Sequence, residues 1–337
     1  MKKIKLLSAL IGAVISMNSF VFAMNTNTYT YADNLVYGDF EYMVEDNNEI
    51  SIFKYNGTST DVTIPETIDG KTVTEIGLCA FEENMNIINV KLPETITKIN
   101  YKAFSKCKNL ETINFPNSLE VIDEYAFTTC HSLKEIKLGS NLTKLGTCAF
   151  QLCISITEIS IPGSLKKVVD HALHGCHSLE TLTIQEGVEE IESTAALNMY
   201  SIRRIIIPES VTSIGEHALG YYYYHPDYIR FDTTIYGYAD TAAEKYAKEN
   251  GFRFIELMSY GDVNNDDAVN ALDASLVLTE YAIISTSKTT TFDSKQKLIA
   301  DVDKNNTIDA VDASNILSYY AYKAAGGNEE PVFYFFG

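Results

Sequence analysis

The sequence predicts an α/β-type solenoid of short strands, followed by a small all-α module that contains two acidic loops. Two observations predict this architecture. A 23-residue pattern recurs without gaps through the middle of the chain, and an acidic pattern near the C-terminus occurs twice, 39 residues apart. Internal repeats of about this length are typical of solenoids, in which each repeat forms one coil.

The N-terminus has the pattern of an export signal. Lysines precede the apolar run of residues 6–15, and small residues at 21–23 provide a cleavage position. We therefore expect residues 1–23 to be a signal peptide and the mature, secreted chain to begin near Met24. No later apolar stretch reaches the ~20 residues that a membrane span needs. The formal charge of −19 disfavours nucleic acid as a partner.

The repeats begin with a degenerate copy at residue 62 and extend to about residue 231. Five consecutive copies have the same length: Lys91–Ile113, Asn114–Ile136, Lys137–Ile159, Ser160–Leu182 and Thr183–Ile205. Apolar residues occupy the second and ninth positions of each copy, and an alanine occupies the thirteenth from Ala80 to Ala218. A single coil cannot bury such a set, so stacked coils must build one continuous core.

Short strands are expected where one copy joins the next, as in "ETINF" (111–115) and "KEIKL" (134–138), because apolar and polar residues alternate there. Residues 232–258 are expected to cap the C-terminal end. In this cap, 239–249 has a helical period, Gly251 ends it, and 252–257 can pair as a last strand. The strand-like region 35–55 should cap the other end, which gives a capped solenoid over 24–258.

Cysteines and histidines in the repeats leave two interpretations open. Four cysteines share the seventeenth position of consecutive copies: Cys107, Cys130, Cys153 and Cys176. They are either a column of small buried thiols or close enough for disulfides between neighbouring coils. His171, His174 and His177 are spaced like zinc ligands, but the positions of His171 and His177 within the copy are variable surface positions.

The two acidic segments match a calcium loop position by position. Positions 1, 3, 5, 7 and 12 of the first loop are Asp262, Asn264, Asp266, the carbonyl of Ala268, and Asp273. The same positions of the second loop are Asp301, Asp303, Asn305, Thr307 and Asp312. Oxygen ligands at alternate positions suit calcium, so we expect two calcium ions. Position 6, usually glycine, is Asp267 and Asn306, which tolerate positive φ better than most residues.

A helical pattern begins within each loop, as "DASLVLTEYA" and "DASNILSYYA", and a short helical piece at 294–300 separates the two units. These features place an all-α module at 259–326, with a tail at 327–337.

Two resemblances follow from these motifs. The pattern "IPxSVTxIGxxAFxxCxxLxxI" resembles BspA-like leucine-rich repeats of bacterial surface proteins, which implies a leucine-rich-repeat solenoid. The duplicated loop and helix resemble a type I dockerin. The second resemblance implies docking onto a cohesin module of a scaffoldin, in a cellulosome-like assembly at the bacterial cell surface. In that family the cohesin-binding residues are at loop positions 10 and 11, which are Ala271, Leu272, Ala310 and Val311 here.

No catalytic motif appears in the repeats, so a non-catalytic binding or adhesion module is expected, with protein or polysaccharide as its ligand in plant-fibre degradation. The exposed strand positions are polar: Thr112, Asn114, Glu135, Lys137, Glu158, Ser160, Thr181 and Thr183. The segment "YYYYHPDY" (221–228) is either a contact patch or an insertion packed on the cap. The alternative function is a cellulosome-associated glycosidase, peptidase or inhibitor with an unrecognised site.

Overall fold

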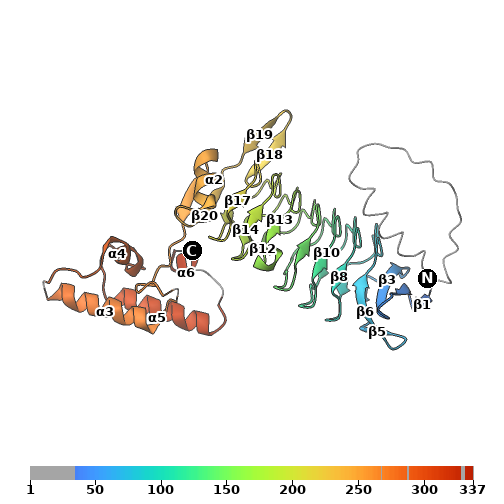
Figure 1. The fold of residues 1–337 in the computed structure, drawn as a ribbon, viewed down its shortest axis with the longest axis horizontal. Helices are drawn as coiled ribbons and strands as arrows, with labels where there is room; N and C mark the ends of the chain where they lie inside the picture. Colours follow the sequence, from blue (N-terminus) through green and yellow to red (C-terminus); the bar gives the residue numbers. More distant parts are fainter. Residues whose placement is uncertain (1–34, 267, 287, 328–330, 337) are drawn as a thin grey trace. The chain divides into compact units, whose positions relative to one another are not determined.

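The structure is a computed structural model that describes residues 35–266, 268–286, 288–327 and 331–336 (Figure 1). The predicted signal peptide lies outside the described residues, and so does Asp267. None of the described helices combines the length and the apolar character that crossing a bilayer requires.

The predicted solenoid is confirmed. Each coil adds a strand to one or both of two parallel ladders, and successive strands lie side by side in Figure 1. The first ladder consists of two separate sheets. One contains β4 (Asp61–Thr63), β7 (Asn89–Lys91) and β9 (Thr112–Ile113), and the other contains β12 (Glu158–Ile161), β14 (Thr181–Ile184), β16 (Arg204–Ile206), β20 (Thr234–Gly237) and β21 (Arg253–Glu256). The second ladder is interrupted in the same way, between β6 (Lys71–Ile76), β8 (Lys98–Ile99), β10 (Val121–Ile122) and β11 (Lys144–Leu145) and the sheet of β13 (Lys167–Val168), β15 (Glu190–Ile191) and β17 (Ser213–Ile214).

The pairing register equals the sequence period. Val121 pairs with Lys144 in the next coil and with Lys98 in the previous one. Each residue therefore lies beside its counterpart in the neighbouring copies, which is the condition for a continuous core.

Strands outside the two ladders close the ends of the array. β2 (Phe40–Val44) and β3 (Ile50–Tyr55) form an antiparallel pair, and β3 joins β6 in parallel. β1 (Leu35–Tyr37) borders β2, and β5 (Thr67–Ile68) pairs with β6. The last coil contains the hairpin of β18 (Tyr221–Tyr224) and β19 (Asp227–Arg230). Away from the ends, a short 3-10 helix, η1, covers Gly163–Leu165.

The core consists of columns of like residues. The alanine column from Ala80 to Ala218 is buried throughout. Beside it, four phenylalanines stack ring on ring, with centroids 4.8–5.3 Å apart: Phe81, Phe104, Phe127 and Phe150. In the later coils Leu173 and Leu219 take over the column. Alanine is needed where the turns approach most closely, because a larger side chain would meet the neighbouring coil.

Two features of the ladders differ from the prediction. The segment "KEIKL" (134–138) does not form a strand. Its Lys134 N–H donates to the Glu111 carbonyl at 3.2 Å, but the segment is not part of a sheet with β9 or β12. The second ladder was not predicted as strands, because only two residues of each coil pair there, too few to show an alternating pattern.

The cap helix α2 (Ala242–Asn250) ends at Gly251, whose φ of 70° is left-handed, and the chain then forms β21 against β20. The residues that follow form α3 (Ala271–Ser285), α4 (Ser294–Ala300) and α5 (Ala310–Ala324). The tail at 327–337, for which no element was predicted, contains α6 (Pro331–Phe336), whose Tyr334 ring lies 5.1 Å from that of Tyr319 on α5.

The alanine column yields the first testable prediction. Ala149→Arg should lower the free energy of unfolding by more than about 4 kcal/mol, since an unpaired charge would be buried between two coils. Circular dichroism and thermal melting would measure the loss. Ser140→Arg, at an exposed position of the same coil, is the control and should melt like wild type. A folded Ala149→Arg protein with an unchanged melting temperature would contradict the buried register.

Candidate functional site

The two acidic loops precede α3 and α5 and are positioned by identical helix starts. Asn270 caps α3 by accepting a hydrogen bond from the Leu272 N–H at 2.7 Å, and Asp309 caps α5 by accepting one from Val311 at 2.7 Å. In each case the third helical residue is an aspartate whose side chain bonds back to the capping residue's N–H. The helix start therefore fixes the last acidic residue of each loop.

That last aspartate also pulls the beginning of the loop toward the helix. Asp273 Oδ1 accepts hydrogen bonds from the Val263 and Asn264 N–H groups, at 2.9 and 3.2 Å. In the second loop, Asp312 Oδ1 accepts from the Val302 N–H at 2.9 Å. Position 12 of each loop thus lies against position 2, so the segment between them closes into a ring.

Closure brings the predicted ligands together. Asp262, Asp266 and Asp273 each place a carboxylate oxygen within 4.8 Å of the others, and Asp301, Asp303 and Asp312 do the same. Among the described residues, these two clusters are the groups of acidic, histidine or cysteine side chains that converge in this way. Three carboxylates in so small a space repel one another unless a cation neutralises them.

The other predicted ligands lie on the same rings. Asn264 Oδ1 accepts from the Asp266 N–H at 3.0 Å, and Asn305 Oδ1 accepts from the Thr307 N–H at 2.7 Å. The Ala268 carbonyl accepts a hydrogen bond from the Asn270 side chain at 3.0 Å. At position 6 of the second loop, Asn306 has a φ of 65°, so the chain makes there the turn for which glycine is usual.

Burial of these carboxylates has an electrostatic cost. In the second loop, burial raises the pKa of Asp312 to about 6 against the hydrogen bonds from Asp309 and Asp303, which lower it. Burial likewise raises the pKa of Asp301. Oxygen donors of this kind, held close together and costly to leave charged, are suited to a hard divalent cation such as calcium.

The residues at loop positions 10 and 11 are exposed. Leu272 and Val311 show 55% and 51% of their surface, and Ala271 and Ala310 are exposed beside them. They are therefore surface residues rather than the core of the helix starts. Tyr281 and Tyr320, which were not among the predicted contact residues, are also exposed at equal positions of the two helices; their spacing of 39 residues in the sequence equals that of the loops.

The two copies differ in polarity at one buried position. Glu280 of α3 is buried, whereas the equivalent residue of α5 is Tyr319. The Glu280 carboxylate accepts hydrogen bonds from the Thr290 and Thr291 hydroxyls and from the Thr291 N–H, which outweigh burial and lower its pKa. Glu280 therefore anchors the connection to α4, and α3 and α5 are supported by different neighbours.

The cysteine column is a set of buried, free thiols. Each donates to the carbonyl of a phenylalanine one coil earlier; Cys107 Sγ lies 3.0 Å from the Phe81 oxygen, and Cys130 Sγ lies 3.1 Å from that of Phe104. Burial raises the pKa of Cys107 to about 12. The thiols thus satisfy core carbonyls, and no disulfide joins neighbouring coils in the described structure.

The histidine cluster does not converge as metal ligands would. His174 contacts the side-chain amides of Gln151 and Asn198, at 3.2 and 2.8 Å, one from each ring nitrogen. Burial lowers the pKa of His174 to about 4. The His171 ring lies near Asp170 and Thr194 instead. The three side chains therefore pack and form hydrogen bonds on one coil and its neighbours, and they do not share a metal-binding geometry.

Of the polar positions predicted to be exposed on strands, Thr112 and Glu158 are exposed strand residues, Asn114, Glu135 and Lys137 are exposed outside strands, and Ser160, Thr181 and Thr183 are half-buried. Ion pairs cross the coils; Lys134 lies 2.5 Å from Glu111 and Lys144 lies 2.8 Å from Asp123. The tyrosine segment forms the β18–β19 hairpin, where Tyr224 is largely exposed and Tyr221 is buried against the cap. The segment is thus packed on the cap at Tyr221, while a contact role for its exposed tyrosines stays a prediction.

Comparison with known proteins agrees with this geometry. The family profile described as "BspA type Leucine rich repeat region (6 copies)" matches residues 48–176 and 102–224, and the profile described as "Dockerin type I domain" matches residues 260–319. No curated protein matches the chain.

The solenoid is also similar to solved bacterial leucine-rich repeat structures. A T. pallidum leucine rich repeat protein aligns with a TM-score of 0.51 and 23% identity, over 64% of this chain and 95% of its own. A Bacteroides ovatus leucine-rich repeat protein aligns with a TM-score of 0.50 and 21% identity, over 67% of this chain and 68% of its own. At these identities the likeness concerns the fold.

The acidic clusters predict a calcium-dependent melting transition. EDTA should lower the melting temperature of the C-terminal module by on the order of 10 °C, because a ligand that binds only the folded state stabilises it by mass action. Asp262→Ala with Asp301→Ala should abolish the shift, since each removes the first ligand of a loop. Calorimetry of the full chain would measure it. Glu209→Ala with Glu216→Ala, two exposed solenoid carboxylates, should keep the shift. An EDTA-insensitive wild type would contradict the assignment.

The raised pKa of Asp312 predicts a pH dependence of calcium affinity in the second loop. Above pH ~6 the carboxylate is ionised and available; as the pH falls through about 6, protons compete with calcium, so affinity should decline. Calcium titration of Asp262→Ala, in which the second loop dominates, at about pH 7 and about pH 5 would test this. Equal affinity at both values would be the contrary result.

Proposed function

Since the chain belongs to the BspA-type leucine-rich repeat family and carries a type I dockerin domain, we propose that it is a non-catalytic, extracellular component of a cellulosome. The dockerin docks onto a cohesin of a scaffoldin and thereby attaches the protein at the bacterial cell surface. The solenoid then presents a binding surface for polysaccharide or protein during plant-fibre degradation. The observation that carries the proposal is the pair of loop-and-helix units with matching exposed residues.

The dockerin would hold two calcium ions, one in each loop. Type I dockerins bind calcium, and the convergent carboxylates support one ion per cluster. The side chains of Asn264, Asn305 and Thr307 and the Ala268 carbonyl would complete the oxygen donors. Bound calcium would neutralise each ring and hold the start of the following helix in place. The exposed residues of that helix would consequently be presented in a fixed geometry.

The proposed cohesin contact comprises Ala271 and Leu272 in one copy and Ala310 and Val311 in the other. All four are exposed and apolar, and they occupy the first turn of α3 and α5. Farther along the helices, Leu278 and Tyr281 match Leu317 and Tyr320, with two-fifths or more of each surface exposed. Exposed leucine and tyrosine at matching positions are typical anchors of a protein interface.

Near-identity of the copies supports two binding modes related by a half-turn. Each helix begins with the same capping box and presents the same residue types at the same offsets. A cohesin that recognises one copy can therefore meet nearly the same surface on the other. The helices diverge at their last turn, where Ile284 corresponds to Lys323, so the equivalence concerns the first three turns.

A binding role for the solenoid fits the kinds of domain present, since neither matched family is catalytic. Several solenoid carboxylates are paired with lysines of neighbouring coils, as Glu83 is with Lys106 at 2.5 Å. Such pairs hold surface side chains in place and do not provide an acid and a base for hydrolysis. Hydrolase activity on plant polysaccharides or casein by the purified protein would favour the alternative function.

Cohesin binding tests the proposal and its symmetry. Leu272→Asp should cost little affinity for a cohesin from the same cell, because the second copy substitutes for the first. Leu272→Asp with Val311→Asp should cost about 2–4 kcal/mol, because either orientation then buries a carboxylate. Isothermal titration calorimetry with calcium present would measure both.

The matched control is Leu78→Asp with Met85→Asp, two exposed apolar residues of the solenoid, which should bind like wild type. Loss of binding in the single variant would limit docking to the first copy. Failure of the wild type to bind any cohesin would overturn the proposed docking.

A further inference from the structure

Arginine is confined to the last coils of the solenoid. The chain has four arginines, and all lie between residues 203 and 253: Arg203, Arg204, Arg230 and Arg253. Arg230 lies over the Phe252 ring, 5.3 Å from its centroid. The other three lie on or next to the first ladder, at its C-terminal end. In a chain with a formal charge of −19, this is a local concentration of positive charge.

Sheet register places two of these arginines in one row. Arg204 of β16 pairs with Thr234 of β20, and Thr234 pairs with Arg253 of β21. On the other side Arg204 pairs with Thr181 of β14. The row therefore alternates threonine and arginine across four strands, and the two guanidinium groups start from strands about 10 Å apart, which is two strand spacings.

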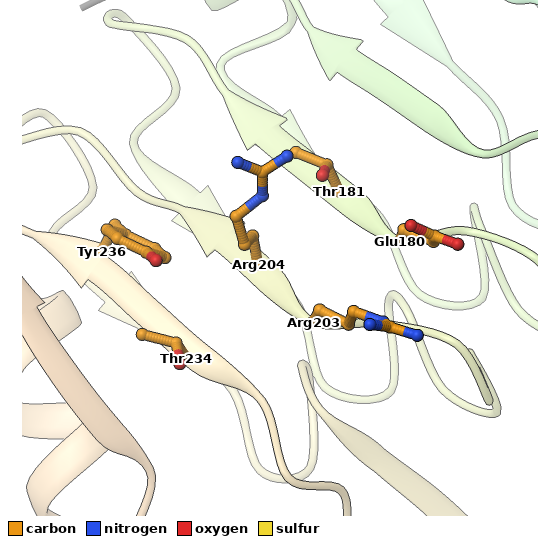
Figure 2. A pocket seen from close by; sticks show the side chains of 6 residues that line it. All are labelled: Glu180, Thr181, Arg203, Arg204, Thr234 and Tyr236. Atoms are coloured by element: carbon orange, nitrogen blue, oxygen red, sulfur yellow. The ribbon is translucent and has the colours of Figure 1, made fainter. Parts of the chain in front are cut away.

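Three residues of the row, Thr181, Arg204 and Thr234, line a shallow pocket of about 340 Å³. Figure 2 shows its lining: Glu180, Thr181, Arg203, Arg204, Thr234 and Tyr236. In this view the Arg204 side chain extends across the strand toward Thr181, and the Tyr236 ring borders the pocket on the opposite side of Arg204. Guanidinium, hydroxyl and phenol groups thus surround one open surface.

The pocket arginines differ from the lysines of the solenoid. Many lysines are neutralised across the coils, as Lys167 is by Glu190 at 3.0 Å. Within the described part of the chain, neither Arg203 nor Arg204 has a carboxylate within ion-pair distance, and both side chains are exposed. Their backbone N–H groups bond to the Glu180 carbonyl, at 3.0 and 3.1 Å, which holds the pair on the strand edge. The two side chains leave the chain in different directions (Figure 2), so each exposes its own planar guanidinium group to an anion.

We propose that this pocket binds the carboxylate of an acidic saccharide, such as a uronate unit of a polysaccharide chain. The proposal rests on the solenoid being the binding module of the proposed function and names its ligand class. Arg204 would hold the carboxylate, Arg203 would add positive charge at the edge of the pocket, and Thr181 and Thr234 would bond to sugar hydroxyls. Arg253 would meet a second carboxylate of the same chain.

The shape and lining favour a saccharide over an acidic peptide. The pocket is a shallow depression lined by residues of three neighbouring strands rather than an enclosed cavity, so a polymer could lie across it. Its uncharged polar groups are hydroxyls, which match a ligand rich in hydroxyls. The net negative charge of the protein also repels polyanions in general, so binding would have to come from this local site.

Glu180 is the acidic residue among those that line the pocket, and it provides a test of the proposed ligand class. Its exposed carboxylate lies on the Arg203 side of the pocket and would repel a second anion while accepting hydrogen bonds from hydroxyls. Glu180→Gln should therefore bind uronates more tightly, whereas Arg203→Ala with Arg204→Ala should bind them at least about tenfold more weakly.

The experiment is titration of the full-length mature chain with short galacturonate oligomers. Arg203→Lys with Arg204→Lys separates charge from geometry: lysine keeps the charge but loses the planar fork, so affinity should fall between wild type and the alanine variant. Lys91→Ala with Lys108→Ala removes two exposed positive charges elsewhere on the solenoid and should not change affinity. Melting temperatures of all variants would show that the fold is retained.

Further probes distinguish other ligands. Neutral xylose oligomers, glutamate oligomers and inorganic phosphate should each bind at least about tenfold more weakly than galacturonate. Equal binding of glutamate oligomers would replace the saccharide with an acidic peptide, and equal binding of phosphate would show a general anion site; either result overturns the proposal. Unchanged galacturonate binding in the alanine variant would do so as well.

Cohesin titration of the same alanine variant provides an independent readout. It should bind cohesin like wild type, because the substitutions lie in the solenoid. Loss of galacturonate binding with intact cohesin binding supports the pocket. Intact cohesin binding by a wild type that binds no galacturonate overturns the pocket and leaves the proposed docking standing.

Discussion

In the copies of equal length, each coil of the solenoid is held to the next by backbone hydrogen bonds that recur at the same positions of every copy. The bonds are not confined to strands: the turn amide of Phe104 donates to the Ala126 carbonyl of the next coil at 2.8 Å, and the equivalent bond joins Phe127 to Ala149. A side chain larger than alanine at the tight turn would separate the coils and break these bonds. Constant coil length thus underlies the phenylalanine stack, the thiol column and both ladders, and it explains why the period is so evident in the sequence.

In the dockerin, one carboxylate of each loop has two structural roles. Asp273 and Asp312 close their loops by bonding to the backbone at the start, and they also complete the capping boxes of α3 and α5. Ligand position and helix start are consequently coupled through a single side chain. Any cation that these carboxylates hold would act on the helices directly, so the exposed residues of the first helical turn are as ordered as the loop behind them.

The sequence predicts the features that recur at a constant spacing. It does not predict features that depend on strand pairing between segments of different length. The core columns, the aligned cysteines and the acidic loops can be predicted because their residues recur at the same positions of each copy. The arginine row cannot: Thr181 and Arg204 are one 23-residue period apart, but the β18–β19 hairpin lengthens the next interval and the cap shortens the one after it, so Arg204, Thr234 and Arg253 share no period. Likewise, the raised pKa of Asp312 comes from burial, which charge patterns along a chain do not display. Helix α6 is short, and tertiary contacts with Tyr319 and Tyr322 support it more than any local signal.

The reactivity of the buried thiols can report when neighbouring coils of the solenoid separate. Cys107, Cys130, Cys153 and Cys176 belong to four consecutive coils, each fully buried and each protonated well above neutral pH because of burial. An alkylating reagent can react with one of them only while its coil is detached from a neighbour. The four labelling rates would then map, coil by coil, where the array frays first and whether detachment spreads from the aromatic half or from the aliphatic half of the core.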